Sequence, residues 1–289
     1  MSDPQALYID FCKSSFLDLD LNGLSILLDC ANGATYSVAP KVFSDLGAKV
    51  ETIASSPDGI NINQNCGTTN PNFLREEIMR GSYDIGIAFD GDGDRILIVN
   101  SDGEILDGDD ILYILSNNFS QDTGVVGTLM TNKSLELYFG KNEIPFLRAE
   151  VGDRYVLHKL IEKSWFLGGE PSGHIICLDC APTGDAIIAA LKLLHAIRDN
   201  NFSLKKSLEG FTKFPQTLIN LKVNNPNKII ISDKFWSEVT RIEKQLGKNG
   251  RVLIRPSGTE PLIRIMVESD KSGASDDFCN ALADLAQTI

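Results

Sequence analysis

An acidic loop between two apolar runs constrains the fold of this chain more than any other feature. Residues 89–95 read FDGDGDR, and apolar stretches at 83–88 and 96–99 flank them. Each stretch has the length and composition of a buried strand, so the loop is predicted to lie at the carboxyl end of a strand. Glycines between the three acidic residues allow tight curvature, so the acidic side chains can converge. Those residues are Asp90, Asp92 and Asp94.

The converging carboxylates predict a metal site. They repel one another unless a cation lies between them, and oxygen ligands of this kind suit Mg²⁺ or Ca²⁺ rather than zinc. An EF-hand is excluded, because its loop needs glycine at position six and glutamate at position twelve, where this chain has Arg95 and Ser101. A solvated acidic turn between two strands is the alternative. Arg95 favours the metal site, because a cation beside three carboxylates is well placed to meet a phosphate group.

Composition limits the class of protein. The 289 residues suffice for two or three domains, and a net charge of −12 argues against a general nucleic-acid or anionic-membrane surface. No apolar run approaches the roughly 20 residues that cross a bilayer, and the polar start lacks the regions of a signal peptide. Six cysteines are scattered without a disulfide framework, and the lone CxxC at 177–180 is predicted to hold buried structural thiols. These features predict a cytoplasmic protein with neither a nucleic-acid nor a membrane partner.

Strand and helix patterns alternate along most of the chain, which predicts mainly parallel or mixed sheets covered on both faces. The predicted fold class is α/β, with two α/β/α sandwich domains at 1–107 and 108–213 and a smaller C-terminal α+β domain at 214–289. In the second domain, Asp109 is expected to cap a helix. Ligands of such sheets bind at the carboxyl ends of strands, where the acidic loop is placed.

A second loop has the composition of an anion cradle. Residues 255–261 read RPSGTEP and lie between two predicted strands. Its hydroxyls and its glycine N–H can approach an oxyanion closely, and flanking arginines can grip phosphate oxygens in pairs. A well-formed hairpin turn is the alternative. The candidate phosphate-binding residues are Arg255, Ser257, Gly258, Thr259 and Arg264.

A third loop, GGEPSGH at 168–174, offers polar groups suited to sugar hydroxyls. Glu170 accepts hydrogen bonds, whereas Ser172 and His174 can donate or accept them. Taken alone, this spacing is not specific. Arg154, near the start of a predicted helix, either meets a second phosphate or pairs with the adjacent Asp153.

The three loops, in their order along the chain (89–95, then 168–174, then 255–261), resemble those of the α-D-phosphohexomutase superfamily. More narrowly, the segments DCANGA at 29–34, PDGININ at 57–63 and VGDRYV at 151–156 resemble the bacterial phosphoglucosamine mutase family. The likeness runs from about residue 7 to the C-terminus.

The resemblance implies an isomerase that interconverts glucosamine 6-phosphate and glucosamine 1-phosphate for cell-wall precursor synthesis. A phosphoserine would donate its phosphoryl group to form a bisphosphorylated sugar, which turns around and returns its other phosphate. Mg²⁺ would be held by the three aspartates, and Arg95 would contact the transferring group. The 168–174 loop would grip the sugar, and the region from Arg255 to Arg264 would hold the phosphate that is not reacting.

Two departures from the family pattern shape this expectation. The Ser-His-Asn-Pro stretch that typically carries the phosphoserine does not occur, and the chain begins where the family's second domain begins. We therefore expect a fragment or one half of a split enzyme, inactive alone, whose serine is supplied by a separate domain. Glu150 stands where relatives often carry lysine, which removes a positive charge near the sugar. Weak Mg²⁺ affinity is expected without the phosphoserine.

Two other classes stay open on sequence alone. One is a Mg²⁺-dependent sugar phosphatase of the haloacid-dehalogenase type, which also places an Asp-x-Asp loop after a strand. The other is a non-catalytic module that binds sugar phosphates or serves in assembly. The sequence also leaves open a homodimer, and it does not separate glucosamine from glucose or mannose phosphates.

Overall fold

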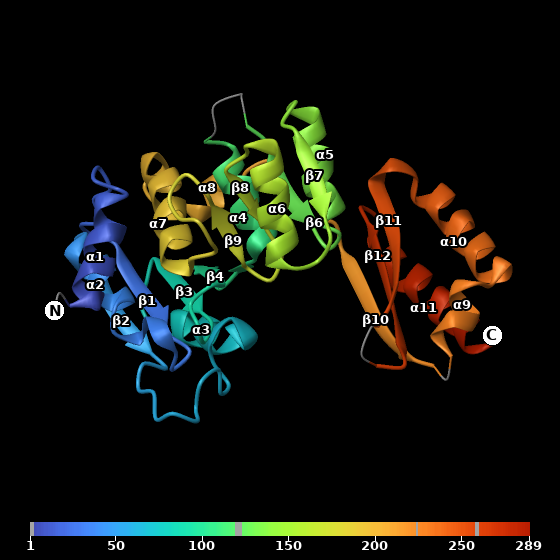
Figure 1. Ribbon diagram of the computed structural model, residues 1–289, viewed down its shortest axis with the longest axis horizontal. Coiled ribbons are helices and arrows are strands. Elements are labelled where there is room, and N and C mark those ends of the chain that lie inside the picture. The colour runs from blue at the N-terminus through green and yellow to red at the C-terminus, as the bar shows by residue number, and fades with distance from the viewer. Residues whose placement is uncertain (1–2, 119–122, 224, 258–259) are drawn as a thin grey trace. The chain divides into compact units, whose positions relative to one another are not determined.

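The computed structural model describes residues 3–118, 123–223, 225–257 and 260–289 (Figure 1). It divides into two compact units. The first contains the residues up to 131 together with 139–210, and the second contains 132–138 together with 211–289. Helix α5 (Lys133–Lys141) therefore begins in the second unit and ends in the first.

The first sheet carries the acidic loop. Its strand order is β2-β1-β3-β4-β5, with β2, β1 and β3 parallel and with β4 and β5 antiparallel to their neighbours. The acidic loop is thus the turn of a hairpin between β3 and β4. Leu74 and Ile78, one turn apart on α3, pack against the sheet through Leu27 and Ala88. The elements are α1 (Pro4–Ser14), β1 (Ser25–Asp29), η1 (Ala34–Tyr36), α2 (Ala39–Asp45), β2 (Lys49–Ile53), η2 (Gly67–Thr69), α3 (Pro71–Arg80), β3 (Ile85–Phe89), β4 (Ile96–Asn100) and β5 (Ile105–Leu106).

The second sheet has the order β7-β6-β8-β9, with only β9 antiparallel to its neighbour. Val156 and Leu160 of α6 pack against it beside Val126 and Ile176. The elements are α4 (Gly108–Ser116), β6 (Val125–Thr128), β7 (Phe146–Ala149), α6 (Asp153–Lys163), β8 (Leu167–Gly169), β9 (Ile175–Cys177), α7 (Ala186–Ile197), η3 (Arg198–Asn200) and α8 (Leu204–Ser207). The prediction of two α/β/α sandwiches, each with a mixed sheet, is confirmed.

One predicted helix cap is wrong. Asp107, not Asp109, caps α4, because its side chain accepts hydrogen bonds from the backbone N–H groups of Asp109 and Asp110. The side chain of Asp110 accepts in return from the N–H of Asp107, which completes a capping box. Three aspartates follow one another within four positions here, so composition alone could not identify the cap.

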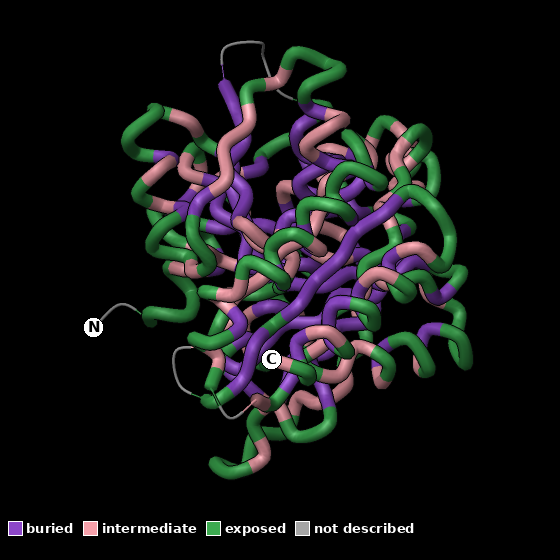
Figure 2. The backbone as a smooth tube through the Cα atoms, turned by 90° about the vertical axis from the view of Figure 1, so that its right-hand side faces the viewer, coloured by how far each residue is buried: buried purple, intermediate pink, exposed green. Residues whose placement is uncertain are grey.

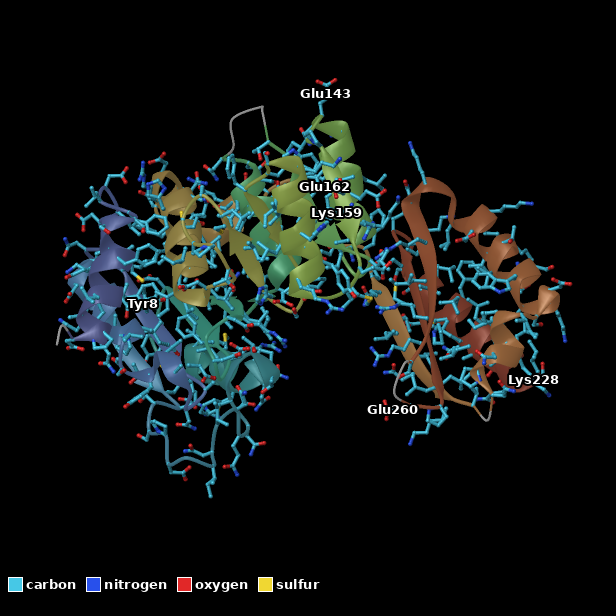
Figure 3. All side chains as sticks on the ribbon, in the orientation of Figure 1. Tyr8, Glu143, Lys159, Glu162, Lys228 and Glu260 are labelled. Atoms are coloured by element: carbon cyan, nitrogen blue, oxygen red, sulfur yellow. The ribbon has the colours of Figure 1, made fainter. Side chains whose placement is uncertain are left out.

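A side-chain contact joins the two α/β/α sandwiches of the first unit. The hydroxyl of Tyr8, which Figure 3 labels on α1, donates to both carboxylate oxygens of Asp185, at 2.9 and 3.0 Å. Asp185 in turn caps α7 by accepting from the N–H groups of Ile187 and Ile188. Burial and the carboxylate of Asp185 raise the pKa of Tyr8, so the phenol keeps its proton and remains a donor.

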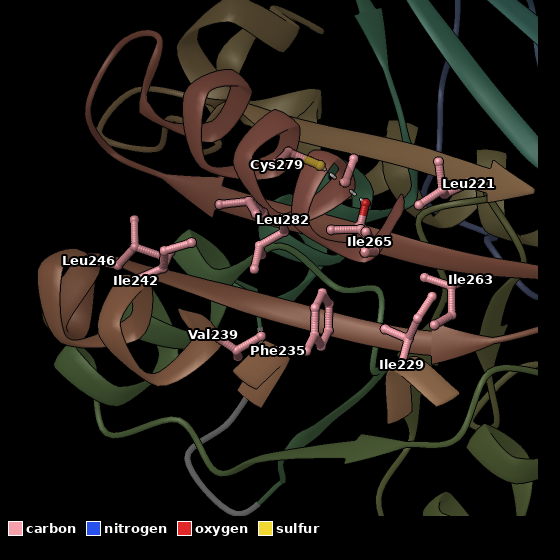
Figure 4. Close-up of a cluster of buried hydrophobic side chains, with 13 residues drawn as sticks. Leu221, Ile229, Phe235, Val239, Ile242, Leu246, Ile263, Ile265, Cys279 and Leu282 are labelled. Carbon is pink, nitrogen blue, oxygen red and sulfur yellow. Dashed lines mark hydrogen bonds between the residues drawn. The ribbon is translucent and has the colours of Figure 1, made fainter. Parts of the chain in front are cut away.

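The second unit is the smaller α+β domain. Its antiparallel sheet has the order β10-β12-β11, and its helices cover one face. Phe235, Val239, Ile242 and Leu246 recur along α10 at helical spacing and are all buried in the core (Figure 4). The elements are β10 (Gln216–Lys222), α9 (Pro226–Ile230), α10 (Asp233–Leu246), η4 (Gly247–Asn249), β11 (Gly250–Pro256), β12 (Leu262–Ser269) and α11 (Ala274–Gln287).

Figure 2 colours the buried residues purple; they make up all or most of β1, β3, β4, β6 and β12, whereas β2 and β10 are mostly half-buried or exposed. Cys177 is buried as predicted, and burial raises the pKa of its thiol to about 12, whereas Cys180 is half-buried. Within the part of the chain that the structure describes, no helix has both the length and the apolar character needed to cross a membrane.

Candidate functional site

The carboxylates of Asp90, Asp92 and Asp94 converge as the sequence predicts. One ligand oxygen from each lies within 4.8 Å of the others. Asp90 follows the last residue of β3 and is buried, and its Oδ1 accepts the backbone N–H groups of Gly93, Asp94 and Arg95, each at 3.1 Å. A single carboxylate oxygen thus closes the hairpin. Its second oxygen, Oδ2, lies 3.8 Å from Nε of Arg95.

These residues fit a hard divalent cation. Oδ1 of Asp94 is buried and accepts no hydrogen bond, so a buried anionic oxygen is left without a donor. Burial and the adjacent Asp94 raise the pKa of Asp90, with the N–H of Arg95 opposing them. A cation coordinated by the carboxylate oxygens relieves this electrostatic repulsion, and Mg²⁺ prefers oxygen ligands of this kind.

Arg95 extends from the same loop. Its Nε lies 3.8 Å from Oδ2 of Asp90 and 3.7 Å from Oδ1 of Asp94, and 49% of its side chain is exposed. The guanidinium is therefore anchored at one end by the carboxylates and open to solvent at the other. This is the geometry in which an arginine can meet an incoming anion.

His174 ends the loop at residues 168–174, here called the sugar loop, and contacts the acidic loop at residues 89–95, here called the metal loop. Its ring is buried, and Nδ1 lies 3.2 Å from Oδ2 of Asp94. Gly184 makes room for the ring, because a Cβ at that position would stand 2.3 Å from Nε2. The ring thus contacts an aspartate of the acidic loop through Nδ1, while the contact of His174 with sugar hydroxyls stays a prediction.

The sugar loop is joined to the metal loop through the backbone. The N–H of Ile96, directly after Arg95, donates to the carbonyl oxygen of Gly173 at 3.1 Å. Gly173 has φ +92°, and a Cβ there would stand 2.0 Å from the carbonyl oxygen of Ile96. At the other side, the N–H of Gly108 donates to the carbonyl oxygen of Pro171 at 3.3 Å. Glycine at 173 is therefore required by both conformation and close approach.

Glu170 connects the sugar loop to the loop that carries Arg154. Its Oε1 accepts the N–H of Gly152 at 2.9 Å, which leaves Oε2 for another donor. Arg154 is exposed and is held by Tyr155, whose hydroxyl lies 2.6 Å from the guanidinium and whose ring centroid lies 4.6 Å from it. Ser172 is exposed on the same loop as Glu170. Arg154 and Ser172 are thus exposed and Glu170 is partly exposed, and the contacts of these three residues with a ligand stay predictions.

In the second unit, Arg255 on β11 and Arg264 on β12 are direct cross-strand partners. Asn220 on β10 faces Arg264 from the other side. The neighbours Ile263 and Ile265 belong to the helix-covered core, so Arg264 lies on the opposite face of the sheet. Like charges directly opposite one another are unfavourable, and a bound anion would relieve that repulsion.

The turn between these strands is partly described. The N–H of Ser257 donates to the carbonyl oxygen of Leu262 at 2.9 Å, and its Oγ accepts the N–H of Glu260 at 3.2 Å. Gly258 and Thr259, the other predicted phosphate-binding residues, lie outside the described residues.

Comparison with known families covers most of the chain. Models for the phosphoglucomutase/phosphomannomutase family match three consecutive segments: alpha/beta/alpha domain II at residues 6–103, alpha/beta/alpha domain III at 107–214, and the C-terminal domain at 218–285. Each model belongs to the same family, and the three follow one another in domain order.

Relatives are similar over the whole chain. The phosphoglucosamine mutase of Acinetobacter baylyi is 48% identical over 288 residues, which are 99% of this chain and 65% of that protein. That of Pseudomonas aeruginosa is 45% identical over 294 residues, with 100% of this chain and 66% of that protein covered. The chain thus spans slightly less than two thirds of the curated relatives it matches.

Solved structures share the fold. A Burkholderia thailandensis phosphoglucomutase/phosphomannomutase family protein superposes with a TM-score of 0.81 at 23% identity, covering 98% of this chain and 65% of that one. The Aspergillus fumigatus N-acetylphosphoglucosamine mutase, in complex with GlcNAc-6P and magnesium, gives 0.77 at 20% identity, covering 97% and 70%. Together with the three domain matches, these similarities show that the chain belongs to the phosphoglucomutase/phosphomannomutase family.

Proposed function

We propose that this chain provides the metal, sugar and phosphate loops of a phosphoglucosamine mutase, which interconverts glucosamine 6-phosphate and glucosamine 1-phosphate. The observation that carries the proposal is the convergence of Asp90, Asp92 and Asp94 in one loop. Ile96, which directly follows that loop, donates a backbone hydrogen bond to Gly173 of the sugar loop. Relatives 45% and 48% identical to this chain are phosphoglucosamine mutases. Three domains, at 1–107, 108–213 and 214–289, are part of the proposal.

The proposed cation is Mg²⁺, held by the three aspartates. When bound, it would neutralise negative charge on the oxygens of a transferring phosphoryl group. Arg95 would add a second positive charge to the same group from its solvent-exposed end. His174 would keep Asp94 in position through the contact at 3.2 Å.

Substrate orientation is assigned to the other loops. Glu170, Ser172 and His174 would contact the sugar hydroxyls, and Arg154 would contact a phosphate. Arg255 and Arg264, with Ser257, Gly258 and Thr259 in the intervening turn, would hold the phosphate that is not reacting. Fixing the distant phosphate places the other end of the sugar for reaction, and the same contacts would serve both orientations of a bisphosphorylated sugar.

The phosphoryl donor is proposed to come from outside these residues. No Ser-His-Asn-Pro stretch occurs in the 289 residues, and in the family that stretch carries the phosphoserine. We therefore expect turnover only when a serine-bearing domain is supplied.

A reconstitution assay tests this proposal. The chain is mixed with a phosphorylated serine-bearing domain of a bacterial phosphoglucosamine mutase, Mg²⁺ and glucosamine 6-phosphate, and ³¹P NMR follows the products. Glucosamine 1-phosphate that forms only when both proteins are present is the expected result. Release of inorganic phosphate by the chain alone would instead indicate a phosphatase. Binding of the sugar phosphate without turnover in the mixture would indicate a non-catalytic module.

A further inference from the structure

The carboxylate of Asp29 fastens two loops together at the end of β1. Asp29 is the last residue of that strand and is fully buried. Its Oδ1 accepts the N–H of Ala31 at 3.0 Å, and its Oδ2 accepts the N–H of Gly67 at 2.7 Å. A buried carboxylate is unfavourable unless its oxygens are satisfied. Here both oxygens are satisfied by backbone groups from segments far apart in the sequence.

Gly67 carries this contact to the metal loop. It has φ +66°, and a Cβ there would stand 2.5 Å from the carbonyl oxygen of Phe89 and 2.7 Å from the Cβ of Ala31. Its α-carbon therefore lies close against the backbone of the residue that precedes Asp90. The position of Gly67 thus fixes where the metal loop leaves β3.

The turn after Asp29 supports the loop at a second point. The N–H of Ala34 donates to the carbonyl oxygen of Gly91 at 2.8 Å. A Cβ on Gly33 would stand 2.2 Å from that same oxygen. Asn63 backs the loop as well, because a Cβ on Gly91 would stand 2.8 Å from its Nδ2. Two segments therefore lie against the backbone between Asp90 and Asp92.

Both segments hold strained backbone. Ala31, Asn32 and Asn63 have φ values of 52°, 47° and 57°, in a region that residues other than glycine seldom occupy. Strain of this kind persists where the surroundings over-determine the conformation, and it gathers at functional sites. The N–H of Asn63 also donates to the carbonyl oxygen of Ala31 at 2.8 Å, so the two strained segments are tied to each other.

We propose that Asp29 is a positioning residue for the metal loop: it holds the Ala31–Ala34 turn and Gly67 against the loop so that the three aspartates converge. The proposal rests on the proposed metal site. Aspartate is suited to this task because both of its oxygens accept, whereas asparagine would turn an NH₂ group toward one of the two N–H donors. Burial raises the pKa of Asp29, and its two backbone donors oppose that shift.

The test measures metal affinity in matched variants. Mn²⁺ binding is followed by electron paramagnetic resonance for the unaltered chain, Asp29→Asn and Asp84→Asn. Asp84 is the control, because its Oδ2 likewise accepts a backbone N–H, from Ser25 at 2.8 Å, but at the other end of β1 and at the surface. Asp29→Asn is expected to raise the Kd at least about tenfold, as loss of an outer-shell partner does in metal sites. Asp84→Asn is expected to leave the Kd unchanged.

A second pair tests the same contact without removing a charge. Gly67→Ala introduces a Cβ that collides with the carbonyl oxygen of Phe89, whereas Gly59→Ala has a similar positive φ, +94°, with nothing within 4 Å. Weaker binding in Gly67→Ala but not in Gly59→Ala is expected, and it decides the matter if Asp29→Asn does not fold.

Three outcomes would overturn the proposal. Unchanged affinity in folded Asp29→Asn or Gly67→Ala would show that Asp29 does not position the loop. Failure of both variants to fold, while Gly59→Ala folds, would assign Asp29 to the stability of the sheet. An unaltered chain that binds no Mn²⁺ would refute the metal site itself, which separates that failure from failure of the positioning role.

Discussion

Nδ1 of His174 lies 3.2 Å from Oδ2 of Asp94, so the loop that is predicted to bind the sugar contacts the loop that is predicted to bind the metal. A backbone bridge pairs Arg95 with His174 beside this contact, and the N–H of Ile96 bonds to Gly173. A change in one loop therefore reaches the other through one side chain and the adjoining backbone.

Replacing His174 tests that contact. His174→Leu removes the ring nitrogen beside Asp94, and metal affinity is expected to fall about tenfold, as for other residues that orient metal ligands. Calorimetric titration with Mg²⁺ measures the change. His195→Leu is the control, because His195 contacts Asp18 on a different surface of the same unit. Equal affinity in the two variants would contradict a positioning role for His174.

Gly173 should tolerate no side chain. Its φ of +92° alone costs about 1–2 kcal/mol for alanine, and a Cβ would also stand 2.0 Å from the carbonyl oxygen of Ile96. Gly210 has φ +87° with nothing within 4 Å, so Gly210→Ala isolates the conformational term. In urea unfolding, Gly173→Ala is expected to lose at least about 2 kcal/mol more than Gly210→Ala. Equal losses would mean that the loop moves freely away from β4.

The facing arginines of the second unit should respond to phosphate. Inorganic phosphate at ten times its Kd stabilises a folded protein by about 1.4 kcal/mol. We expect a rise in the unfolding temperature with phosphate for the unaltered chain and a much smaller rise for Arg264→Gln. Arg241→Gln, at an exposed arginine paired with Glu238 on α10, should behave like the unaltered chain. A phosphate response that survives in Arg264→Gln would contradict the anion site.

Glu268 should be the most stability-sensitive carboxylate of the second unit among the described residues. It is fully buried, accepts from Nε and an Nη of Arg251 at 2.8 and 3.0 Å, and accepts the N–H of Lys133 at 2.8 Å. Glu268→Gln removes a charge from a buried pair, which typically costs about 3–5 kcal/mol. Glu238, which pairs with the exposed Arg241 at the surface of α10, gives the control, since Glu238→Gln should change the free energy of unfolding by less than about 1 kcal/mol. Equal costs in urea unfolding would refute this ranking.

The metal loop should also shape the pH dependence of stability. Burial and Asp94 raise the pKa of Asp90, so the folded chain binds this proton more tightly than the unfolded chain does. The contribution of Asp90 to stability is therefore present below its unfolded pKa, about 3.9, and is lost as the pH rises through the folded value. In EDTA, Asp90→Asn should lack this loss, and the difference from the unaltered chain should shrink when Mg²⁺ is added. A difference that is independent of pH would contradict the crowding of the carboxylates.

Local patterns were enough to predict the strands that flank the acidic loop. The apolar runs at 83–88 and 96–99 became β3 and β4, because continuous apolar stretches of this length are stable only when buried. The convergence of the aspartates followed from glycines at alternate positions. Long-range contacts were not predictable in this way. No spacing rule links Asp29 to Gly67, and the contact of His174 with Asp94 depends on the pairing of two hairpins.

Strand β10 was missed for a local reason. Residues 216–222 lie between Pro215 and a run of asparagines, a composition more typical of a domain boundary than of a strand. Register with β12 decides the outcome, because Leu221 faces Ile263 in the core while Asn220 faces Arg264. Asn220 lies beside Arg264 and Arg255 only because of this register.

The reconstituted mutase assay with paired aspartate variants is the most direct measurement of the central claim. Asp92→Asn removes one carboxylate of the proposed metal site, whereas Asp102→Asn removes an exposed carboxylate in the next turn of the same sheet. With the serine-bearing domain and Mg²⁺ present, formation of glucosamine 1-phosphate should persist in Asp102→Asn and fall at least about a hundredfold in Asp92→Asn. Equal turnover by the two variants would contradict a metal-dependent phosphoryl transfer at this loop.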